Sequence, residues 1–484
     1  MIIHNIMNRQ QFNSINNIGQ VLTFQKSGDT SSFDPLITFS SGSKRVSWKL
    51  NNGTETSLVA GNSIIYTGFT SDTSIREIQM RGNSFKNLNQ FILNNDNLYG
   101  NLDVSLLPNI TYLSVDSNPN LTGITHTYSS GNFIAYLINN CNLIGNLDLT
   151  KLSGLGGDFR TNSNPNLTGI THTASTQIFT TYLINNCNLI GNLDLTKLSG
   201  LGGDFRTNSN PNLTGITHTA STQIFTSYNV TSCNIIGNHN LTMFPNLGGT
   251  LQFSQNTNLT GITHTASTQN ITLYAAQNCE LTGNHNLSWF SNLGGVVSIN
   301  GNSLLTSITH TASTKNFTQY NIHQNNITGT HDISMFSNFG GSSTGSTCYA
   351  TFYLNPNLTN ITFPTTNGYF KNFVNTESQG ALGLYSCNLD YVDFTPLSGA
   401  TLLTGSTQGN PRISLRDNSM SAGDVNHILV DFSGNTTVNP VGWSNVNLNI
   451  GGTNADPDSS SGGYDGLAAI AFLTGSPYNW TITY

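Results

Sequence analysis

Charged side chains are scarce in this 484-residue sequence. Asp, Glu, Lys and Arg make up 8% of it, against about 25% in an average soluble protein, so Asn, Thr, Ser and Gly must solvate the surface. The net charge of −7 is spread thinly and no basic run occurs, which argues against nucleic acid as a partner. The 16 Lys and Arg residues leave few tryptic cleavage points, as suits a protein that works outside cells.

Long apolar runs are absent as well. The first residues, MIIHNIMNRQQFNSINN, lack the uninterrupted apolar stretch of a secretory signal. The run GLAAIAFL near the end is too short to cross a bilayer. We therefore expect neither entry into the Sec pathway nor membrane insertion, although a signal removed beforehand would leave the same sequence.

Glutamate is rare, and the few acidic residues do not form an obvious catalytic pair. The Glu residues are Glu55, Glu77, Glu280 and Glu377, and no two are close in sequence. Asp148 and Asp194 occupy equivalent positions in two successive copies of a repeat, which in a stacked β fold puts them at the upper limit of the ~5 to 9.5 Å that separates glycosidase carboxylates. An enzyme also needs one unique site, whereas this sequence repeats itself. We expect no enzymatic activity and no cofactor.

Repetition is the main feature that the sequence does have. Residues 136–181 and 182–227 are identical at 45 of 46 positions, the exception being Thr181 against Ser227. Half of that period is the basic unit, because an Asn or Cys, here called the anchor, recurs at every 23rd position. Apolar residues precede most anchors at −5 and −3 and follow them at +2 or +3. The anchors are Asn118, Cys141, Asn164, Cys187, Asn210, Cys233, Asn256, Cys279, Asn302 and Asn325.

This pattern resembles the leucine-rich repeat family, whose core reads L-x-L-x-x-N/C-x-L and whose period is a little over twenty positions. The resemblance covers about residues 88–484 and implies one short parallel strand per unit, with alternate side chains buried against the neighbouring units. We therefore predict a mainly β fold, a leucine-rich repeat solenoid of about 14 coils. The anchors are expected to be buried and to form a ladder of hydrogen bonds to backbone carbonyls.

The composition divides the chain into four parts. We predict a docking leader at 1–20, a small all-β, sandwich-like domain at 21–86, regular 23-residue repeats at 87–340, and longer, irregular repeats with a C-terminal cap at 341–484. The second part resembles β-sandwich modules that precede leucine-rich repeats in Bacteroidota, on the basis of Trp48 and the Asn-Gly-Thr that follows it.

The last part carries the only helices that we expect. Its anchors, Asn325, Asn355, Cys387 and Asn418, are spaced more widely than the earlier ones, so these coils are longer. Ser421 is suited to cap a helix together with Asp424. The apolar residues that follow share one helical face; they are Val425, Ile428, Leu429 and Phe432. The final segment, with NIGGTNADPD before it, resembles the terminal repeat of leucine-rich repeat proteins of Bacteroidota and their phages.

Cysteine and histidine recur without the spacing of a disulfide or a metal site. Cys141, Cys187, Cys233 and Cys279 are two coils apart, roughly 9.5 Å in a stacked sheet, whereas a disulfide needs less than about 7 Å between Cα atoms. A bridge between Cys348 and Cys387 stays open. The same spacing keeps stacked histidines from sharing one zinc ion, which leaves only a cross-column pair such as His218 with His239 as an alternative. We therefore expect no metal, and Thr-His-Thr pleats that face solvent; the histidines are His126, His172, His218, His264 and His310, with a second column at His239, His285 and His331.

One further motif is compatible with a cation. The sequence DPDSSSGG from Asp456 suggests a calcium loop, but Gly462 falls one position late for an EF-hand and no Glu closes the loop. A polar turn is the alternative.

Positions −4, −2 and −1 before each anchor should face outward from the concave sheet. They are rich in amides and hydroxyls, which hydrogen-bond sugar hydroxyls but also simply solvate a sheet. The candidate binding residues are Asn139, Asn140, Arg160, Asn162, Asn185, Asn186, Arg206, Asn208 and Gln252. Only a modular role, multivalent contact or rigid spacing, tolerates a verbatim copy of two whole units.

The family resemblance, the low charge and the repeats together suggest a structural virion protein. We expect a fibre, spike or capsid appendage of a phage that infects Bacteroidota, located on the virion and outside cells. It would contact other virion proteins through its N-terminal region, form a homo-oligomer on the particle, and attach to a host cell-surface polysaccharide or protein. The alternative is a bacterial secreted or surface leucine-rich repeat adhesin. An intracellular interaction scaffold fits the low charge poorly.

Overall fold

The computed structural model describes residues 20–27, 36–39, 45–50, 56–59, 75–82, 85, 88–340, 349–366, 368–371, 381–403, 412–433 and 443–484. The docking leader predicted at 1–20 lies outside these residues except for its last one. The chain divides into two compact units, Met1–Phe225 and Thr226–Tyr484.

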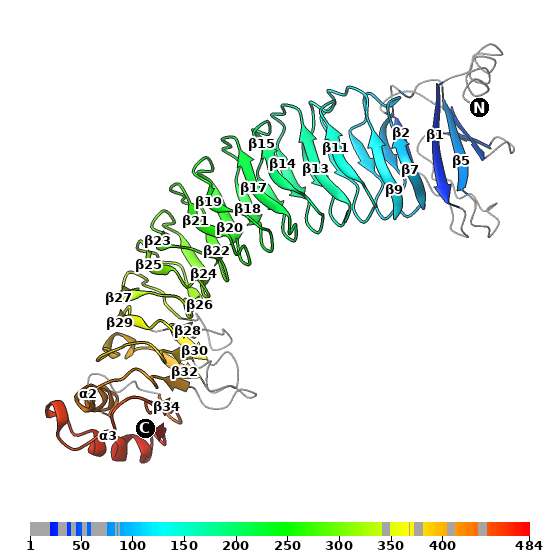
Figure 1. Ribbon diagram of the computed structural model, residues 1–484. Coiled ribbons are helices and arrows are strands. Elements are labelled where there is room, and N and C mark those ends of the chain that lie inside the picture. Colours follow the sequence, from blue (N-terminus) through cyan, green and yellow to red (C-terminus); the bar gives the residue numbers. More distant parts are fainter. Residues whose placement is uncertain are drawn as a thin grey trace, which may run out of the picture. The chain divides into compact units, whose positions relative to one another are not determined.

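The first unit is made of short strands (Figure 1). They are β1 (Gln20–Ser27), β2 (Leu36–Phe39), β3 (Arg45–Leu50), β4 (Thr56–Val59), β5 (Ile75–Gly82), β6 (Leu88–Ile92), β7 (Leu98–Asp103), β8 (Tyr112–Ser114), β9 (Asn120–Thr125), β10 (Ala135–Leu137), β11 (Gly145–Leu149), β12 (Gly157–Arg160), β13 (Leu167–His172), β14 (Phe179–Leu183), β15 (Gly191–Leu195), β16 (Gly203–Arg206) and β17 (Leu213–His218).

The second unit continues with strands and ends in helices. The strands are β18 (Phe225–Asn229), β19 (Gly237–Asn240), β20 (Leu247–Gln252), β21 (Leu259–Thr263), β22 (Ile271–Ala275), β23 (Gly283–Asn286), β24 (Leu293–Ser298), β25 (Leu305–Thr309), β26 (Phe317–Asn321), β27 (Thr328–Asp332), β28 (Tyr349–Thr351), β29 (Asn357–Thr362), β30 (Tyr369–Lys371), β31 (Leu382–Gly383), β32 (Thr401–Leu403), β33 (Arg412–Ser414), β34 (Asn447–Asn449) and β35 (Thr481–Thr483). The helices are η2 (Thr395–Leu397), α2 (Ala422–Ser433), η3 (Ser461–Gly463) and α3 (Gly466–Thr474).

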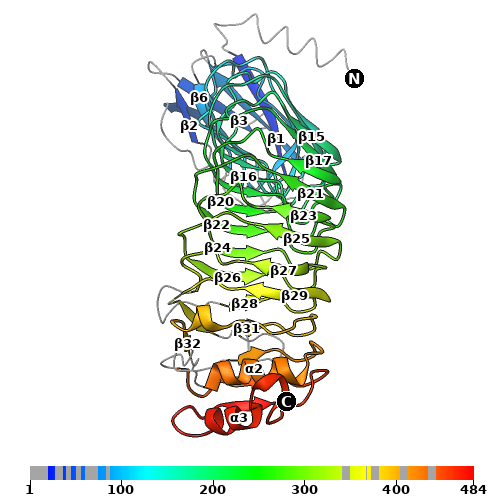
Figure 2. The same ribbon diagram turned by 90° about the vertical axis from the view of Figure 1, so that its left-hand side faces the viewer.

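One strand of every coil joins a long parallel sheet. In the first unit β6, β8, β10, β12, β14 and β16 pair in that order; in the second, β20, β22, β24, β26 and β28 are stacked in the same way (Figure 2). In the first unit, successive residues at −5 are in register, Tyr136 with Phe159 and Phe159 with Tyr182. Their buried rings stack with centroids 5.5 and 4.8 Å apart, so burial and ring stacking together fix the register.

In the coils between residues 88 and 362, a further strand lies on a second face, where pairing is interrupted. There the strands form separate two-stranded parallel sheets, β11–β13 and β15–β17 in the first unit. The second unit has β19–β21, β23–β25 and β27–β29. The apolar core lies between the two faces, with Leu147, Ile170 and Leu193 buried beneath the paired strands. The structural unit of this face is therefore two coils rather than one.

Tight packing between coils explains the Gly-Gly pairs of the repeat. Gly203 begins β16 with φ +62°, and a Cβ at this position would stand 2.1 Å from the Thr180 carbonyl oxygen. Only glycine satisfies both the left-handed backbone and this approach.

The N-terminal strands extend both faces. β1 pairs antiparallel with β5 and with β7, the first strand of the second face. β3 pairs with β4 and β5, and β2 pairs antiparallel with β6, the first repeat strand of the long sheet. These strands thus pair with the first strand on each face, which a solenoid cap must do because an open edge leaves backbone groups unsatisfied.

The predicted fold class is confirmed: the chain is a mainly β solenoid with units of about 23 residues and short helices near its C-terminus. α2 begins where the sequence indicated, since the Ser421 hydroxyl accepts a hydrogen bond from the Asp424 N–H at 3.2 Å. The apolar face of the helix is buried, including Val425 and Phe432. No helix among the described residues has the length and hydropathy to span a membrane.

Candidate functional site

Buried anchors connect neighbouring coils. Asn164 is fully buried, and its Nδ2 donates to the carbonyl oxygens of Ile138 at 2.8 Å and Thr161 at 2.9 Å. Its Oδ1 accepts from the Leu143 N–H at 3.1 Å. The same set of two carbonyls and one N–H recurs at Asn118, Asn210, Asn256, Asn302 and Asn325. The Asn side chain thus satisfies backbone groups at each turn.

Cysteine anchors make a reduced version of these bonds. The Cys141 thiol donates to the Val115 carbonyl at 3.2 Å and the Cys187 thiol to the Thr161 carbonyl at 3.3 Å. Cys141, Cys187, Cys233, Cys279 and Cys387 are buried free thiols. Cys387 donates to the Phe352 carbonyl at 3.3 Å, so the bridge left open in the sequence is not formed by this thiol; Cys348 lies outside the described residues.

We predict that these thiols are protected from alkylation in the folded protein. Burial raises the pKa of Cys141 and Cys387 to about 12, and that of Cys187 and Cys279 to about 11. Very little reactive thiolate is therefore present near neutral pH. Peptide mass spectrometry after iodoacetamide treatment should find all four unmodified in the native protein and fully modified in concentrated guanidinium chloride. Rapid native labelling of Cys187 would contradict the burial of the ladder.

The candidate binding residues lie in or just after strands of the long sheet, and several of their side chains bond nearby aspartates. Four successive strands of the long sheet carry register partners at one position, which are Leu137, Arg160, Leu183 and Arg206. Arg160 Nε lies 2.6 Å from Asp158 Oδ1, and Arg206 Nε lies 2.8 Å from Asp204 Oδ1. The two arginines thus fall in one column two strands apart.

The asparagines among these candidates have backbone roles. Asn140 and Asn186 have φ values of +54° and +55°, a left-handed conformation in which Asn is favoured. Asn139 Oδ1 accepts from the Asn162 N–H at 3.2 Å. Asn162, Asn185 and Asn208 are half-buried in the same unit, and Gln252 is half-buried in β20 of the second unit. Whether this face binds a ligand remains a prediction.

The prediction that the histidines face solvent is wrong. Ile170 and His172 point the same way in β13, so His172 lies inside and is 3% exposed. Its Nε2 lies 2.7 Å from the Tyr182 hydroxyl, and His126 bonds Tyr136 likewise at 2.8 Å. The other members of both columns, His218, His239, His264, His285, His310 and His331, are also buried.

In the second unit a tyrosine hydroxyl lies between two histidines. Tyr274 Oη is 2.9 Å from His264 Nε2 and 2.8 Å from His285 Nε2. One hydroxyl has one proton to donate, so one imidazole must donate and the other must accept. The Nδ1 of His264 is buried and finds no hydrogen-bond partner in the described part of the chain. Its proton therefore belongs on Nε2, which makes His264 the donor and His285 the acceptor.

The described residues offer no group of three or more His, Cys, Asp or Glu that could hold a metal ion. In the predicted calcium loop, Asp458 Oδ1 accepts from the N–H groups of Ser460 and Ser461 and from Asn426 Nδ2, and the Ser461 hydroxyl donates to Oδ2. The carboxylate therefore organises a turn that packs against α2.

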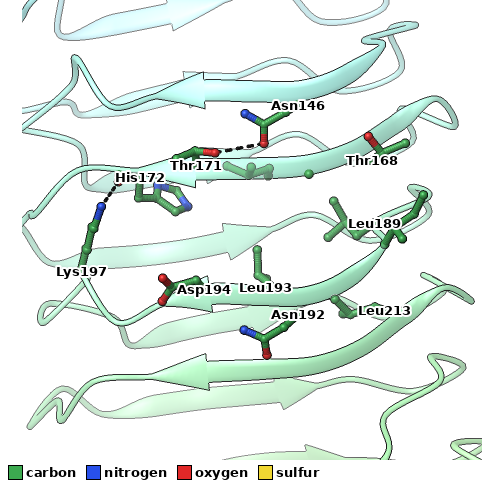
Figure 3. A pocket seen from close by; sticks show the side chains of 13 residues that line it. Asn146, Thr168, Thr171, His172, Leu189, Asn192, Leu193, Asp194, Lys197 and Leu213 are labelled. Atoms are coloured by element: carbon green, nitrogen blue, oxygen red, sulfur yellow. Dashed lines mark hydrogen bonds between the residues drawn. The ribbon is translucent and has the colours of Figure 1, made fainter.

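A groove opens on the second face between β13 and β15, which belong to different two-stranded sheets (Figure 3). Its volume is about 260 Å³. At one end the Ile190 N–H donates to the Thr168 carbonyl at 3.0 Å; at the other, Lys197 Nζ donates to the His172 carbonyl at 3.3 Å. Its lining residues include Asn146, Thr171, Leu189, Asn192 and Asp194.

The sequence does not predict this groove, although its residues recur with the repeat. Asp148 and Asp194 suggest at most a catalytic pair, and Lys151 and Lys197 recur at the same spacing. The feature that could have indicated the groove is the regular recurrence of polar side chains at equivalent positions of the second face. No protein-family model, curated protein or solved structure matches this chain.

Proposed function

We propose that this chain is a non-enzymatic structural protein of a phage virion, a fibre, spike or capsid appendage, that presents a leucine-rich repeat solenoid for attachment to a host cell-surface glycan. The observation that carries the proposal is the verbatim repeat, which sets identical outward groups in columns such as Arg160 and Arg206. Weak contacts repeated along a rigid support add by avidity. The motif resemblance, the low charge and a leader suited to docking support the virion assignment.

The location is tested by mass spectrometry of purified phage particles. We expect peptides of this chain in stoichiometric amount with capsid or tail proteins. Recovery only from the medium or the cell envelope of a bacterium would favour the secreted or surface adhesin instead.

Attachment is tested separately with the isolated protein on intact host cells. We expect the protein to be retained on cells, and retention to fall after enzymatic removal of surface polysaccharide. Retention that is insensitive to polysaccharide removal would point to a protein receptor, and absence of retention would contradict an attachment role. This experiment does not depend on which face of the solenoid makes the contact.

A further inference from the structure

The groove between β13 and β15 combines an apolar floor with a polar rim. Buried Ile170, Leu193 and Leu213 line its inner side. The amides of Asn146 and Asn192, together with Asp194, line its outer part. Small-molecule sites commonly have this composition, an apolar surface with a few placed polar groups.

A buried, unpartnered nitrogen lies against the groove. His172 is 3% exposed, and its Nε2 is committed to the Tyr182 hydroxyl. Its Nδ1 is buried and has no hydrogen-bond partner among the residues that the structure describes. The ring lies between β13 and β15, near the end closed by Lys197 (Figure 3). Because buried polar atoms are normally satisfied, this nitrogen indicates that a small hydroxylated molecule completes the site.

The charges at the rim favour a neutral ligand. Asp194 and Lys197 carry opposite charges at the same end of the groove, so no net charge attracts a phosphate or a sulfate. Asp194 Oδ1 accepts from the Thr196 N–H and hydroxyl, at 2.9 and 2.6 Å. These bonds hold the carboxylate in place. Carboxylate and amide groups around an apolar floor match the hydroxyls and the C–H face of a sugar ring.

The features that close the groove recur one repeat earlier. The Ile144 N–H donates to the Thr122 carbonyl at 2.9 Å, and Lys151 Nζ donates to the His126 carbonyl at 3.2 Å. These two hydrogen bonds link the β9 and β11 segments in the same way as the bonds of Ile190 and Lys197 link the β13 and β15 segments. The repeat is two coils, or about 9.6 Å at the spacing of paired strands, which is close to the length of two linked sugar rings.

An aromatic side chain takes the lysine position in the second unit. The Trp289 carbonyl accepts from the Ser267 N–H, as the Lys197 carbonyl accepts from the Ser175 N–H. Trp289 is 43% exposed. An exposed indole on this face provides an apolar surface with a polar edge, which suits contact with a sugar.

We propose that the groove between β13 and β15 and the equivalent position between β9 and β11, both within the first unit, each bind one sugar ring of a neutral polysaccharide, so that alternate rings of the polymer occupy the two positions. This inference rests on the proposed attachment function and assigns it to the second face of the solenoid. The Asp and Asn side chains bind ring hydroxyls, and a sugar hydroxyl hydrogen-bonds to His172 Nδ1.

Two matched double variants test the groove. Asp148→Asn with Asp194→Asn alters the rim at β15 and the equivalent position at β11, while keeping Oδ1 as the acceptor for the following threonine. Asp390→Asn with Asp393→Asn removes the same number of charges from exposed residues that do not line the groove. The probes are neutral hexasaccharides of β-glucan, mannan and chitin, with a hexauronate as the anionic comparison, and binding is measured by isothermal calorimetry.

The groove also has a direct readout. In protein labelled with ¹⁵N-histidine, a bound neutral hexasaccharide should shift the His172 Nδ1 resonance in a saturable way. We expect affinity to fall at least tenfold in the 148/194 pair and to stay within twofold of wild type in the 390/393 pair. Affinity that falls only after Arg160→Ala with Arg206→Ala, or binding that leaves the His172 resonance unmoved, would overturn the groove assignment and leave attachment to the long sheet. If no probe binds and His172 does not respond to any of them, the groove assignment fails, while retention on host cells still decides the attachment function.

Discussion

Acidification from neutral pH to about pH 5 should unfold the solenoid cooperatively. The cause is the set of buried histidines that bond tyrosine hydroxyls. Burial lowers their pKa to about 4, from an ordinary 6.5, at His126, His172, His239, His285 and His331. The unfolded chain therefore binds protons below pH 6.5 that the folded chain cannot accept until the pH approaches 4.

The direction and size of the effect follow from this difference. Stability is complete above pH 6.5 and is lost as the pH falls between 6.5 and 4, because only the unfolded state is protonated there. At pH 5, which is about 1.5 units below the ordinary pKa, each such imidazole has removed about 2 kcal/mol, since one pH unit corresponds to about 1.4 kcal/mol. The five together therefore match the free energy that separates folded from unfolded states of most domains, which is about 10 kcal/mol.

Thermal unfolding followed by far-UV circular dichroism at a series of pH values measures the loss. A matched variant is His285→Gln, because an amide keeps a partner for the Tyr274 hydroxyl and cannot titrate in this range. Its acid midpoint should move to lower pH. A melting temperature that does not change between neutral pH and about pH 4.5 would show that the imidazoles are not buried in the neutral form.

Replacement of a single buried anchor should destabilise the protein strongly. Asn164→Ala leaves the Ile138 and Thr161 carbonyls and the Leu143 N–H without their partner inside the core. At about 1 to 3 kcal/mol for each of these three buried unsatisfied groups, we expect a loss of about 3 to 9 kcal/mol in the free energy of unfolding. Guanidinium denaturation measures it.

Two comparison variants make this measurement specific. Asn164→Cys should recover part of the loss, because natural cysteine anchors donate to the equivalent carbonyl, as Cys187 does to Thr161. Asn166→Ala removes an exposed side chain that bonds Asn142 across the coils, and surface changes of this kind cost about 0.5 kcal/mol or less. Equal effects at 164 and 166 would contradict the role of the buried ladder.

The period made the strands and the long sheet predictable. A polar anchor in every coil with apolar residues at −5 and −3 allows only one set of side chains to face inward, and Tyr136 and Phe159 lie there in register. The helix at α2 was predictable because its capping residues and apolar face are local in sequence. These features depend on spacing alone.

The second face was not predictable in the same way. Thr171 and Thr173 around His172 suggested a polar, exposed pleat, although the two-residue spacing from Ile170 placed the imidazole inside. What makes a buried histidine acceptable is the Tyr182 hydroxyl, which comes from a strand on the other face. The groove exists because strands β13 and β15 belong to different sheets. No local sequence pattern predicts which neighbouring strands fail to pair.

The paired strands of the second face set the size of a viable duplication. Insertion of one coil would place a β11-like strand where a β13-like partner belongs, and it would separate His172 from its tyrosine partner, Tyr182. Insertion of two coils preserves every such partnership, as the copies at 136–181 and 182–227 show. Recombination between copies should therefore lengthen or shorten this protein in steps of two coils. Natural variants are expected to differ in length by multiples of two coils while keeping the same fold.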